Sequence, residues 1–443
     1  MTKDRIILTI NCGSSSIKYL LYSWQKRRAV ASGMVERIGL SGAMIKHCVS
    51  GKDALTVLIE CPNHETAINL IIKTLLEGEG KVVNSVSEIS AVGHRVVHGG
   101  EKFTKSVRID GLGGDVLNTL KEIAPLAPLH NPVNITGIES AIKLLPDIPH
   151  IAVLDTAFLQ TIPRVNYLYA VPYFWYTKYG VRRYGFHGTS HLYVSKRAAV
   201  MLKKDPFEVN LITCHIGNGV SFTAIRHGLA FDHSMGFTPL EGLIMGTRSG
   251  DLDPSIISYI CQKEHITSKK VEQILNRESG LKGISGKYSD RRDLRKAAES
   301  GDERAQLAID METYRIRKYI GSYMAALGRV DAVVFTAGAG ERAAFLREKA
   351  LSGLEDLGIK LNFNRNEDAC SGYKEFDISQ DDSKVKVLVI PTDEELVFVE
   401  DVVAILENRY DVHTNFVYSF QAPDYVNLER EELYKKEQAA KKN

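Results

Sequence analysis

The sequence predicts an α/β fold built from two similar halves. β-rich and helical segments alternate along its 443 residues, with no low-complexity linker. Two segments, 6–22 and 211–225, share one plan: an apolar strand, a short turn rich in Gly, Asn and Ser, and a second apolar strand. They lie roughly 200 residues apart, far beyond the period of a solenoid repeat. Two related domains that face these turns into a shared cleft explain the pattern, and coincidence between two hairpins is the alternative.

The individual elements follow from hydrophobic patterning. Short apolar runs bounded by turn residues predict strands at 6–10, 19–22, 89–92, 151–154, 211–213, 220–225, 330–336 and 385–391. Helical periodicity predicts helices at 64–76, 132–145, 192–203, 254–264, 270–277 and 302–327. Residues 410–443 differ in composition. There, the spacing of Glu431/Lys435 and Glu432/Lys436 predicts a solvated helix.

The most informative segment is the N-terminal turn, Asn11 to Lys18. It places Gly13, three serines and a lysine between two strands. Exposed backbone N–H groups, hydroxyls and a point charge suit a polyphosphate, and a glycine lets it approach closely. The spacing is not that of the P-loop. An ordinary hairpin turn has the same composition.

A further glycine-rich turn, Ala337 to Glu341, follows the strand predicted at 330–336. A helical segment, 342–349, comes directly after it. A strand, a glycine turn and a helix N-terminus form an arrangement that binds anions or nucleotides.

The composition excludes several classes of protein. The formal net charge of +2 leaves no bulk field to recruit nucleic acid or a membrane surface. No apolar run approaches the roughly 20 residues that span a bilayer, and we expect no signal peptide. The six cysteines include no C-x-x-C pair. We therefore expect a reduced, cytoplasmic protein without a zinc site.

Five segments concentrate polar residues beside glycines or at the ends of strands. They are 94–100, 155–158, 182–191, 245–254 and 393–395. Arginine suits phosphoryl and carboxylate oxygens because its guanidinium group donates in pairs. A carboxylate and a carboxamide suit Mg²⁺. Taken singly, each segment has a structural explanation, such as a helix cap or a buried histidine. Together they favour phosphoryl transfer.

These segments resemble the acetate kinase family over nearly the whole chain, to about residue 408. The matching motifs are 11–18 (NCGSSSIK), 94–100 (HRVVHGG), 127–132 (APLHNP), 155–158 (DTAF), 183–191 (RYGFHGTSH), 215–219 (HIGNG), 245–254 (MGTRSGDLDP) and 391–396 (PTDEEL). The resemblance implies the fold of acetate and sugar kinases, Hsp70 and actin, with two duplicated ribonuclease-H-like domains and the nucleotide in the cleft between them. It implies a domain I of 1–154 plus 394–443, with the acyl substrate, part of the phosphate site and an extra tail. Domain II, 155–393, would bind the nucleotide and form a homodimer.

The resemblance also implies a role for individual residues. Asp155, His187 and Arg248 would be catalytic, and Asn11 and Glu394 would position Mg²⁺, with Mn²⁺ as an alternative. The substrate residues would be Arg95, for the carboxylate, and Val97, Leu129, Phe186 and Pro239, for the acyl pocket. The nucleotide residues would be Ser14, Ser16, Lys18, His215, Ile216, Gly217, Asn218, Gly219, Asp290, Arg291, Arg292, Ala337, Gly338, Ala339, Gly340 and Glu341.

The chain departs from the family pattern at several positions. Leu154 and Leu159 stand where the family usually has Phe and His. Ala337 and Arg342 alter the adenosine turn, which leaves the nucleotide preference open. Asp393 replaces the usual Asn and adds a negative charge beside the expected metal ligand. No counterpart of the tail beyond about residue 408 is evident.

The resemblance implies the reversible conversion of ATP and acetate to ADP and acetyl phosphate, without nucleic acid or membrane partners. Two alternatives stay open. One is a kinase for propionate or another short-chain carboxylate, against which Val97 argues mildly because a smaller residue would deepen the pocket. The other is a non-catalytic, nucleotide-dependent binding protein on the actin-like fold. Such a protein has no need of Arg95, His187 and Arg248 around one site.

Overall fold

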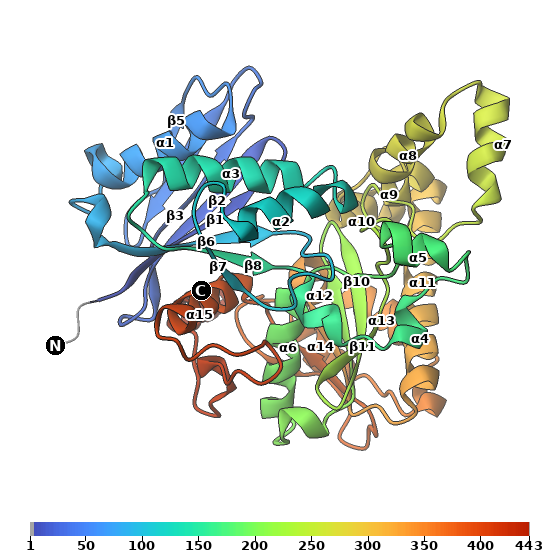
Figure 1. Ribbon diagram of the computed structural model, residues 1–443. Helices are drawn as coiled ribbons and strands as arrows, with labels where there is room; N and C mark the ends of the chain where they lie inside the picture. Colours follow the sequence, from blue (N-terminus) through green and yellow to red (C-terminus); the bar gives the residue numbers. More distant parts are fainter. Residues whose placement is uncertain (1–3, 443) are drawn as a thin grey trace. The chain divides into compact units, whose positions relative to one another are not determined.

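The computed structural model describes residues 4–442, which form two compact units (Figure 1). Unit 1 comprises Met1–Phe158, Asp393–Ser419 and Tyr425–Glu429. Unit 2 comprises Leu159–Thr392, Phe420–Asp424 and Arg430–Asn443. No helix among residues 4–442 combines the length and the apolar character that a membrane crossing requires.

Unit 1 contains an eight-stranded sheet in the order β5-β4-β3-β2-β1-β6-β8-β7. Strands β1, β6 and β8 are parallel to one another, whereas β2 to β5 and β7 run antiparallel to their neighbours. The strands are β1 Ile6–Cys12, β2 Ser16–Ser23, β3 Arg28–Glu36, β4 Met44–Val49, β5 Leu55–Leu58, β6 Ile89–Val96, β7 Val107–Ile109 and β8 His150–Leu154.

Helices cover both faces of this sheet because its central strands are apolar on both sides. Leu8 and Ile10 of β1 join a core with α1 (His64–Leu76), beside α3 (Asn131–Leu144). Ile7, between them in sequence, faces the other way and packs against α15 (Glu394–Leu406). Figure 1 shows α1 and α3 on one side of the strands and α15 on the other. Helix α2 (Asp115–Ile123) completes the layer beside α3.

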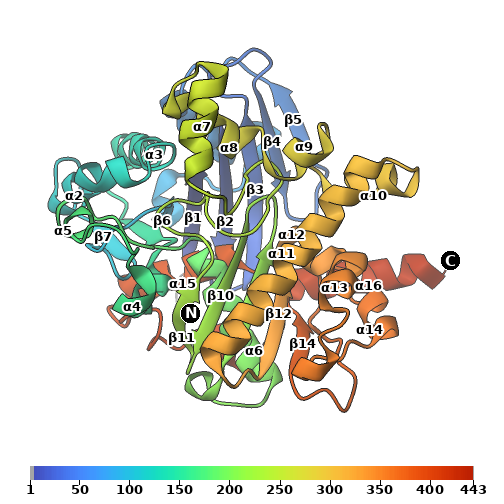
Figure 2. The same ribbon diagram turned by 90° about the vertical axis from the view of Figure 1, so that its right-hand side faces the viewer.

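Unit 2 contains a six-stranded sheet in the order β11-β10-β9-β12-β14-β13. Helix α6 packs on β9 and β12, and Figure 2 shows the long α11 crossing in front of the strands. The strands are β9 Leu211–Ile216, β10 Val220–Arg226, β11 Leu229–His233, β12 Ala332–Thr336, β13 Phe376–Asp377 and β14 Lys386–Val389. The helices are α4 Arg164–Tyr167, α5 Phe174–Tyr179, α6 Gly188–Met201, α7 Ser255–Glu264, α8 Ser268–Arg277, α9 Gly280–Ser285, α10 Arg291–Glu299, α11 Glu303–Leu327, α12 Ala337–Arg342, α13 Ala344–Leu351, α14 Phe363–Asp368 and, mostly in unit 2, α16 Leu428–Lys442.

The two sheets repeat one topology. In unit 1, β3-β2-β1 is an antiparallel meander, followed by parallel β6 and β8 and antiparallel β7. In unit 2, β11-β10-β9 is the same meander, followed by parallel β12 and β14 and antiparallel β13. The likeness between the two predicted hairpins is therefore part of a duplicated sheet, and the predicted α/β class with two related halves is confirmed.

Most predicted elements are present with shifted ends. The helix predicted at 64–76 has those bounds, and the one at 302–327 is α11. The charged helix predicted in the tail is α16, where Lys435 pairs with Glu431. Two helices that carry candidate site residues, α10 and α15, were not predicted. In α15, the run Leu396 to Leu406 is apolar except for Glu400 and Asp401, so no polar face recurs at a helical period.

Candidate active site

Three predicted site residues lie at the carboxyl ends of adjacent parallel strands in unit 1. Asn11 is near the end of β1, Arg95 near the end of β6, and Asp155 directly follows β8. The register aligns Ile10 with His94 and Arg95 with Val153. Carboxyl ends of parallel strands are where ligands of open α/β sheets bind. The topology therefore gathers these three polar side chains at one edge of the sheet.

Asn11 is also paired with Lys18, because the two residues face each other across the β1–β2 hairpin. The turn between them, which carries Ser14 and Ser16, is held from several sides. The Gly13 N–H donates to the carbonyl of Ser16 at 2.8 Å. The imidazole of His64 donates to the carbonyl of Gly13 at 2.7 Å. Lys18 is exposed and Asn11 half-buried. A fixed turn with an exposed cation suits the predicted phosphate contact.

Arg95 and Asp155 form a tight ion pair. Nη2 of Arg95 lies 2.6 Å from Oδ2 of Asp155, and Nε lies 3.0 Å from both carboxylate oxygens. Burial alone would favour the neutral guanidine, but Asp155, then Glu394 and more weakly Glu395, raise the pKa of Arg95 above its usual range. The guanidinium is therefore permanently charged, and its Nη1 has no hydrogen-bond partner within residues 4–442. That edge can receive an anion.

The loop after β6 is fixed by helix α3. The side chain of Asn134 accepts from the N–H of Val97 at 3.1 Å and donates to the carbonyl of Cys12 at 2.8 Å. Asn131 exchanges two hydrogen bonds with the backbone of His98. Val97 is half-buried, and Leu129 is 50% exposed. Both predicted acyl-pocket residues of unit 1 thus stand on segments tied to α3, the helix that also holds the phosphate turn.

Glu394 is the first residue of α15 and is half-buried, whereas Glu395 is exposed. Asp393 caps the helix, since its Oδ1 accepts from the N–H of Leu396 at 3.1 Å. Helix α15 packs against β1, β6 and β8, the three strands that carry Asn11, Arg95 and Asp155. The residues expected to hold a metal therefore come from elements in direct contact.

In unit 2, His187, Gly219 and Arg248 converge. His187 has a left-handed backbone (φ +57°) at the start of α6. A methyl group built on Gly219 would lie 3.3 Å from Cε1 of His187 and 3.5 Å from Nη1 of Arg248. Among residues 4–442, the guanidinium of Arg248 hydrogen-bonds only to the carbonyl of Pro239 at 3.4 Å and the sulfur of Met245 at 3.8 Å. It has no carboxylate partner within residues 4–442, and burial lowers its pKa. Such an unmatched cation attracts an anion.

A buried chain of side chains supports His187. Its Nδ1 lies 2.8 Å from Oγ of Ser221, and Nε2 of His191 lies 2.8 Å from the same oxygen. Burial first, then His233 and His215, lower the pKa of His191 far below its usual value, so this ring is neutral. His215, whose Nδ1 lies 2.8 Å from the Ser190 hydroxyl, stacks on His187 at 4.2 Å between ring centroids. Hydrogen bonds thus fix the orientation of both imidazoles.

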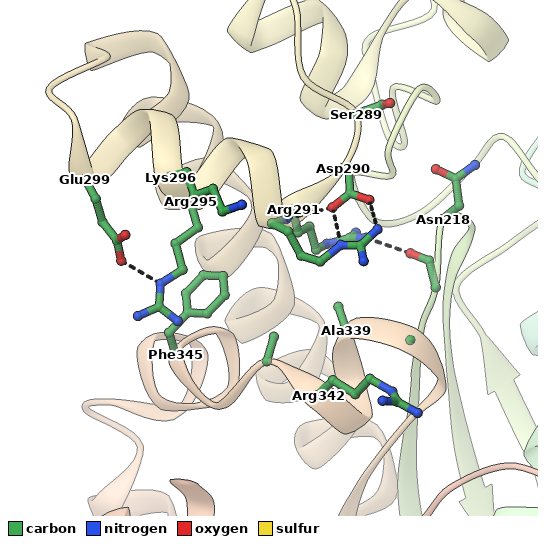
Figure 3. Close-up of a pocket in the computed structure, with 14 residues that line it drawn as sticks. Asn218, Ser289, Asp290, Arg291, Arg295, Lys296, Glu299, Ala339, Arg342 and Phe345 are labelled. Atoms are coloured by element: carbon green, nitrogen blue, oxygen red, sulfur yellow. Dashed lines mark hydrogen bonds and ion pairs between the residues drawn. The ribbon is translucent and has the colours of Figure 1, made fainter. Parts of the chain in front are cut away.

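A cavity of about 760 Å³ opens beside these residues in unit 2 (Figure 3). Its volume suits a nucleoside. Seven predicted nucleotide residues line it: Gly217, Asn218, Asp290, Arg291, Arg292, Gly338 and Ala339. Figure 3 shows α10 on one side and the turn of α12, with Arg342, on the other. Arg291 of α10 connects two neighbouring elements: it donates to the carbonyl of Gly217, after β9, at 2.7 Å and pairs with the buried Glu312 of α11.

Other predicted nucleotide residues do not line this cavity. His215, Ile216, Gly219, Ala337, Gly340 and Glu341 are absent from its lining. Glu341 has an internal role instead: its Oε1 accepts from the N–H of Ala337 at 2.7 Å and of Thr392 at 3.1 Å. Arg342, which was expected to alter the adenosine turn, also lines the cavity, together with residues that were not predicted there: Ser289, Arg295, Lys296, Glu299, Ala343 and Phe345. Arg295, which packs over the ring of Phe345 at 4.7 Å, lies on a charged helix face that resembles any solvated surface in sequence.

Two residues of the expected acyl pocket, Phe186 and Pro239, belong to unit 2. Phe186 is buried, and its N–H donates to Nε2 of His233 at 3.1 Å. Pro239 is half-buried next to Arg248. Val97 and Leu129 lie in unit 1, so the four residues are described within two separate units.

Comparisons with known proteins identify the family. The acetokinase family model matches residues 6–400. An acetate kinase of Geobacter metallireducens is 57% identical over 421 residues, which cover 95% of this chain and 99% of the relative. The crystal structure of Porphyromonas gingivalis acetate kinase is 45% identical, with a TM-score of 0.86 over 91% of this chain and 100% of that chain. A propionate kinase from Francisella tularensis is 38% identical, with a TM-score of 0.83 over 90% and 98%.

The two α/β units define a kinase with the duplicated actin-like ATPase fold. The chain belongs to the acetokinase family. Because 421 residues of this chain align with the Geobacter relative, that alignment extends beyond residue 408. Part of the tail therefore has a counterpart that the sequence analysis did not find.

Proposed function

We propose that this protein catalyses the reversible transfer of the γ-phosphoryl group of ATP to acetate, which gives acetyl phosphate and ADP. Membership of the acetokinase family and the 57% identity to a protein named acetate kinase support this activity. The observation that carries the proposal is Arg248, a half-buried guanidinium beside His187 and the backbone of Gly219, without a carboxylate partner among residues 4–442. Phosphoryl transfer needs positive charge at such a position.

In the forward reaction, one acetate oxygen attacks the γ-phosphorus. The new O–P bond forms as the bond from the γ-phosphorus to the bridging oxygen breaks, and that oxygen leaves with ADP. Acetate is ionised at pH 7, so no base has to remove a proton. Asp155 is paired with Arg95. We therefore assign Asp155 the role of orienting Arg95 and the reacting groups.

Arg95 would hold the substrate carboxylate through the edge of its guanidinium group that Asp155 does not occupy. Val97, Leu129, Phe186 and Pro239 would wall the acyl group. His187 and Arg248 would stabilise the transferred phosphoryl group. Ser14, Ser16, Lys18 and the turn from His215 to Gly219 would contact the phosphates.

The residues of unit 1 suit Mg²⁺ by their chemistry. A carboxamide oxygen from Asn11 and a carboxylate from Glu394 are ligands that Mg²⁺ prefers, and the two residues stand on packed elements. Bound there, Mg²⁺ or Mn²⁺ would neutralise charge on the ATP phosphates. The adenosine would occupy the cavity between α10 and α12, with Asp290, Arg292 and Ala339 among its contacts.

We also propose a cytoplasmic homodimer that forms through unit 2. This unit exposes an aromatic group on and before α5, where Tyr173, Phe174 and Tyr179 are each more than half exposed. Tyr259 of α7 and Tyr314 of α11 are exposed as well. Large apolar side chains in such numbers are typical of a surface that a partner covers. Sedimentation of the purified protein at several concentrations would measure the assembly.

Propionate is a second candidate substrate, because a propionate kinase is among the similar solved structures. A pocket that differs by one methylene discriminates by only about 10- to 200-fold. We expect acetate to give the higher kcat/KM, with propionate detectable. If the wild-type enzyme has the higher kcat/KM for propionate, propionate rather than acetate is the preferred substrate.

The metal assignment has its own test. Glu394→Ala should raise the Mg²⁺ concentration for half-maximal rate and lower kcat, while ADP still binds. Glu395→Ala is the matched control, since Glu395 is exposed and should matter less. If Glu395→Ala is the more damaging change, the ligand assignment is wrong by one residue. If the wild type releases no carboxylate-dependent ADP, the proposed activity is wrong.

A further inference from the structure

The C-terminal tail, residues 409–442, is built into the fold. Tyr418 and Phe420 are at most 1% exposed, and His413 is 2% exposed. The tail contributes to each unit in turn: 409–419 and 425–429 belong to unit 1, and 420–424 and the residues from Arg430 onward belong to unit 2. It lies beyond residues 6–400, which the family model matches, although part of it aligns with the Geobacter relative.

Within unit 1 the tail contacts the cap of α15. Nδ2 of Asn427 donates to Oδ2 of Asp393 at 2.8 Å. The other oxygen, Oδ1, accepts from the N–H of Leu396 and caps the helix. Both oxygens of Asp393 are thus engaged, one by the helix and one by the tail. Glu394 is the next residue, so the direction of its side chain depends on how this cap is held.

Within unit 2 the tail hydrogen-bonds to Pro391 and Thr392, the two residues just before the cap. Nη1 of Arg430 donates to the carbonyl of Pro391 at 2.7 Å, and Nη2 donates to the carbonyl of Thr392 at 2.5 Å. The N–H of Thr392 donates to the buried Glu341. The strand-to-helix connection is therefore fixed through both its carbonyls and an N–H group, and Arg430 stands only three residues after Asn427.

The tail also satisfies the buried acids farther along α15. Asp401 is fully buried and accepts from Nε2 of His413 at 2.8 Å and from the hydroxyl of Tyr418 at 2.8 Å. Glu400 accepts from the N–H of Ser419 at 2.8 Å and from its hydroxyl at 2.5 Å. A buried carboxylate without such donors is costly, so α15 requires the tail in order to pack.

We propose that the tail positions Glu394 for its metal, and that Asn427 is the positioning residue that does so through Asp393. The inference rests on the proposed function, because it takes Glu394 as a Mg²⁺ ligand. It also explains the departure at Asp393: the extra carboxylate stays beside the metal site because the tail supplies a donor for it.

The test exchanges donor and acceptor. Asn427→Asp places a carboxylate against Asp393, which removes the hydrogen bond and adds repulsion. Asp393→Asn alone should be mild, because two amides can still pair and asparagine is a good N-cap. The double variant Asn427→Asp/Asp393→Asn restores one donor and one acceptor. Lys435→Ala is the matched control, because Lys435 lies on the exposed face of α16 and, within residues 4–442, pairs only with Glu431. Deletion of the tail is unsuitable because it would expose the residues that pack under Tyr418 and Phe420.

Two readouts are needed. The Mg²⁺ concentration for half-maximal rate should rise about tenfold in Asn427→Asp, the effect of one lost charge-assisted hydrogen bond, and return to within about twofold in the double variant. Amide exchange of residues 391–399 in metal-free protein should speed up in Asn427→Asp and recover in the double variant. If Asn427→Asp behaves like Lys435→Ala in both readouts, or if the double variant does not recover, the proposal is wrong. Failure of the proposed function would instead appear as a wild type without carboxylate-dependent turnover, while the exchange readout would still report the link between Asn427 and Asp393.

Discussion

The two units have the same sheet topology and opposite chemistry at their strand ends. In unit 1 the ends of β1, β6 and β8 carry Asn11, Arg95 and Asp155, with Glu394 on the helix packed behind them. In unit 2 the corresponding region carries His187, His215 and Arg248, and no carboxylate pairs with that arginine among residues 4–442. Duplication thus supplied two equivalent scaffolds, one with oxygen ligands and a matched arginine, the other with donors and an unmatched cation.

The difference between Arg95 and Arg248 follows from this division. The charge of Arg95 is balanced by Asp155. Its remaining N–H groups can therefore donate hydrogen bonds to a substrate carboxylate without adding net charge to the site. Within residues 4–442, the guanidinium of Arg248 hydrogen-bonds only to a carbonyl and a thioether. Its charge is available for an anion whose own charge increases or spreads during the reaction. We therefore expect loss of Arg248 to affect kcat and loss of Arg95 to affect the KM for the carboxylate.

The largest expected effect comes from Arg248→Ala. Loss of the unmatched cation should lower kcat about 10³-fold or more, in the range found for arginine fingers. The melting temperature should stay close to that of the wild type, because no salt bridge is lost. Steady-state kinetics and thermal unfolding measure the two. Arg248→Lys should recover part of the rate, since lysine restores the positive charge but not the paired N–H donors of the guanidinium group. A folded Arg248→Ala variant with wild-type kinetics would contradict the contrast between the two arginines.

In unit 1, Val97→Ala should alter selectivity more than rate. The substitution opens room for one more methylene, so the acetate-to-propionate ratio of kcat/KM should fall about tenfold, mostly through the KM for propionate. The backbone N–H of Val97 is bound by Asn134 and would stay in place. If the acetate-to-propionate ratio of kcat/KM is unchanged, Val97 does not line the acyl pocket.

Much of this division could be predicted from sequence, and the exceptions have physical causes. The site motifs were visible because glycines and charged residues cluster in short segments, as around Arg248 and His187. The adenosine cavity was only half predicted. Arg295 lies on a helix that resembles any solvated face, and its packing over Phe345 depends on a contact 50 residues away in the chain.

The roles of Glu341 and α15 were hidden for other reasons. Glu341 stands in a nucleotide-like turn, yet its carboxylate binds the N–H groups of Ala337 and Thr392, a contact that depends on tertiary structure. Helix α15 is buried almost throughout, including its acids Glu400 and Asp401, so its sequence shows no polar face at a helical period. Its register, and hence the position of Glu394, is set by packing against the sheet and by the tail.

In unit 2, Ser221→Ala should lower kcat about five- to tenfold, the value of roughly one net hydrogen bond. The hydroxyl lies between Nδ1 of His187 and Nε2 of His191. Since it has one proton, we expect it to donate to His187, which leaves the Nε2–H of that ring directed at the phosphoryl group. Ser190→Ala is the matched control, because Ser190 bonds His215 and not His187. Nitrogen chemical shifts of His187 should show a mixed tautomer only in Ser221→Ala, and equal kinetics in the two variants would contradict this role.

The smallest expected effect concerns the glycine turn of unit 2, where Ala337 has a left-handed backbone with φ +62°. That conformation costs a residue with a Cβ roughly 1–2 kcal/mol. Ala337→Gly removes this cost. Glycine also makes the unfolded chain more flexible, which lowers the free energy of unfolding by roughly 0.4–1 kcal/mol. The net gain should be about 1 kcal/mol or less, which raises the melting temperature by about 2 °C. Ala339→Gly is the opposite control: it lies inside α12 without a positive φ, so the same substitution should destabilise by roughly 1 kcal/mol. Thermal unfolding without nucleotide compares the two variants, and a loss of stability in Ala337→Gly as large as that in Ala339→Gly would show that the turn is unstrained in solution.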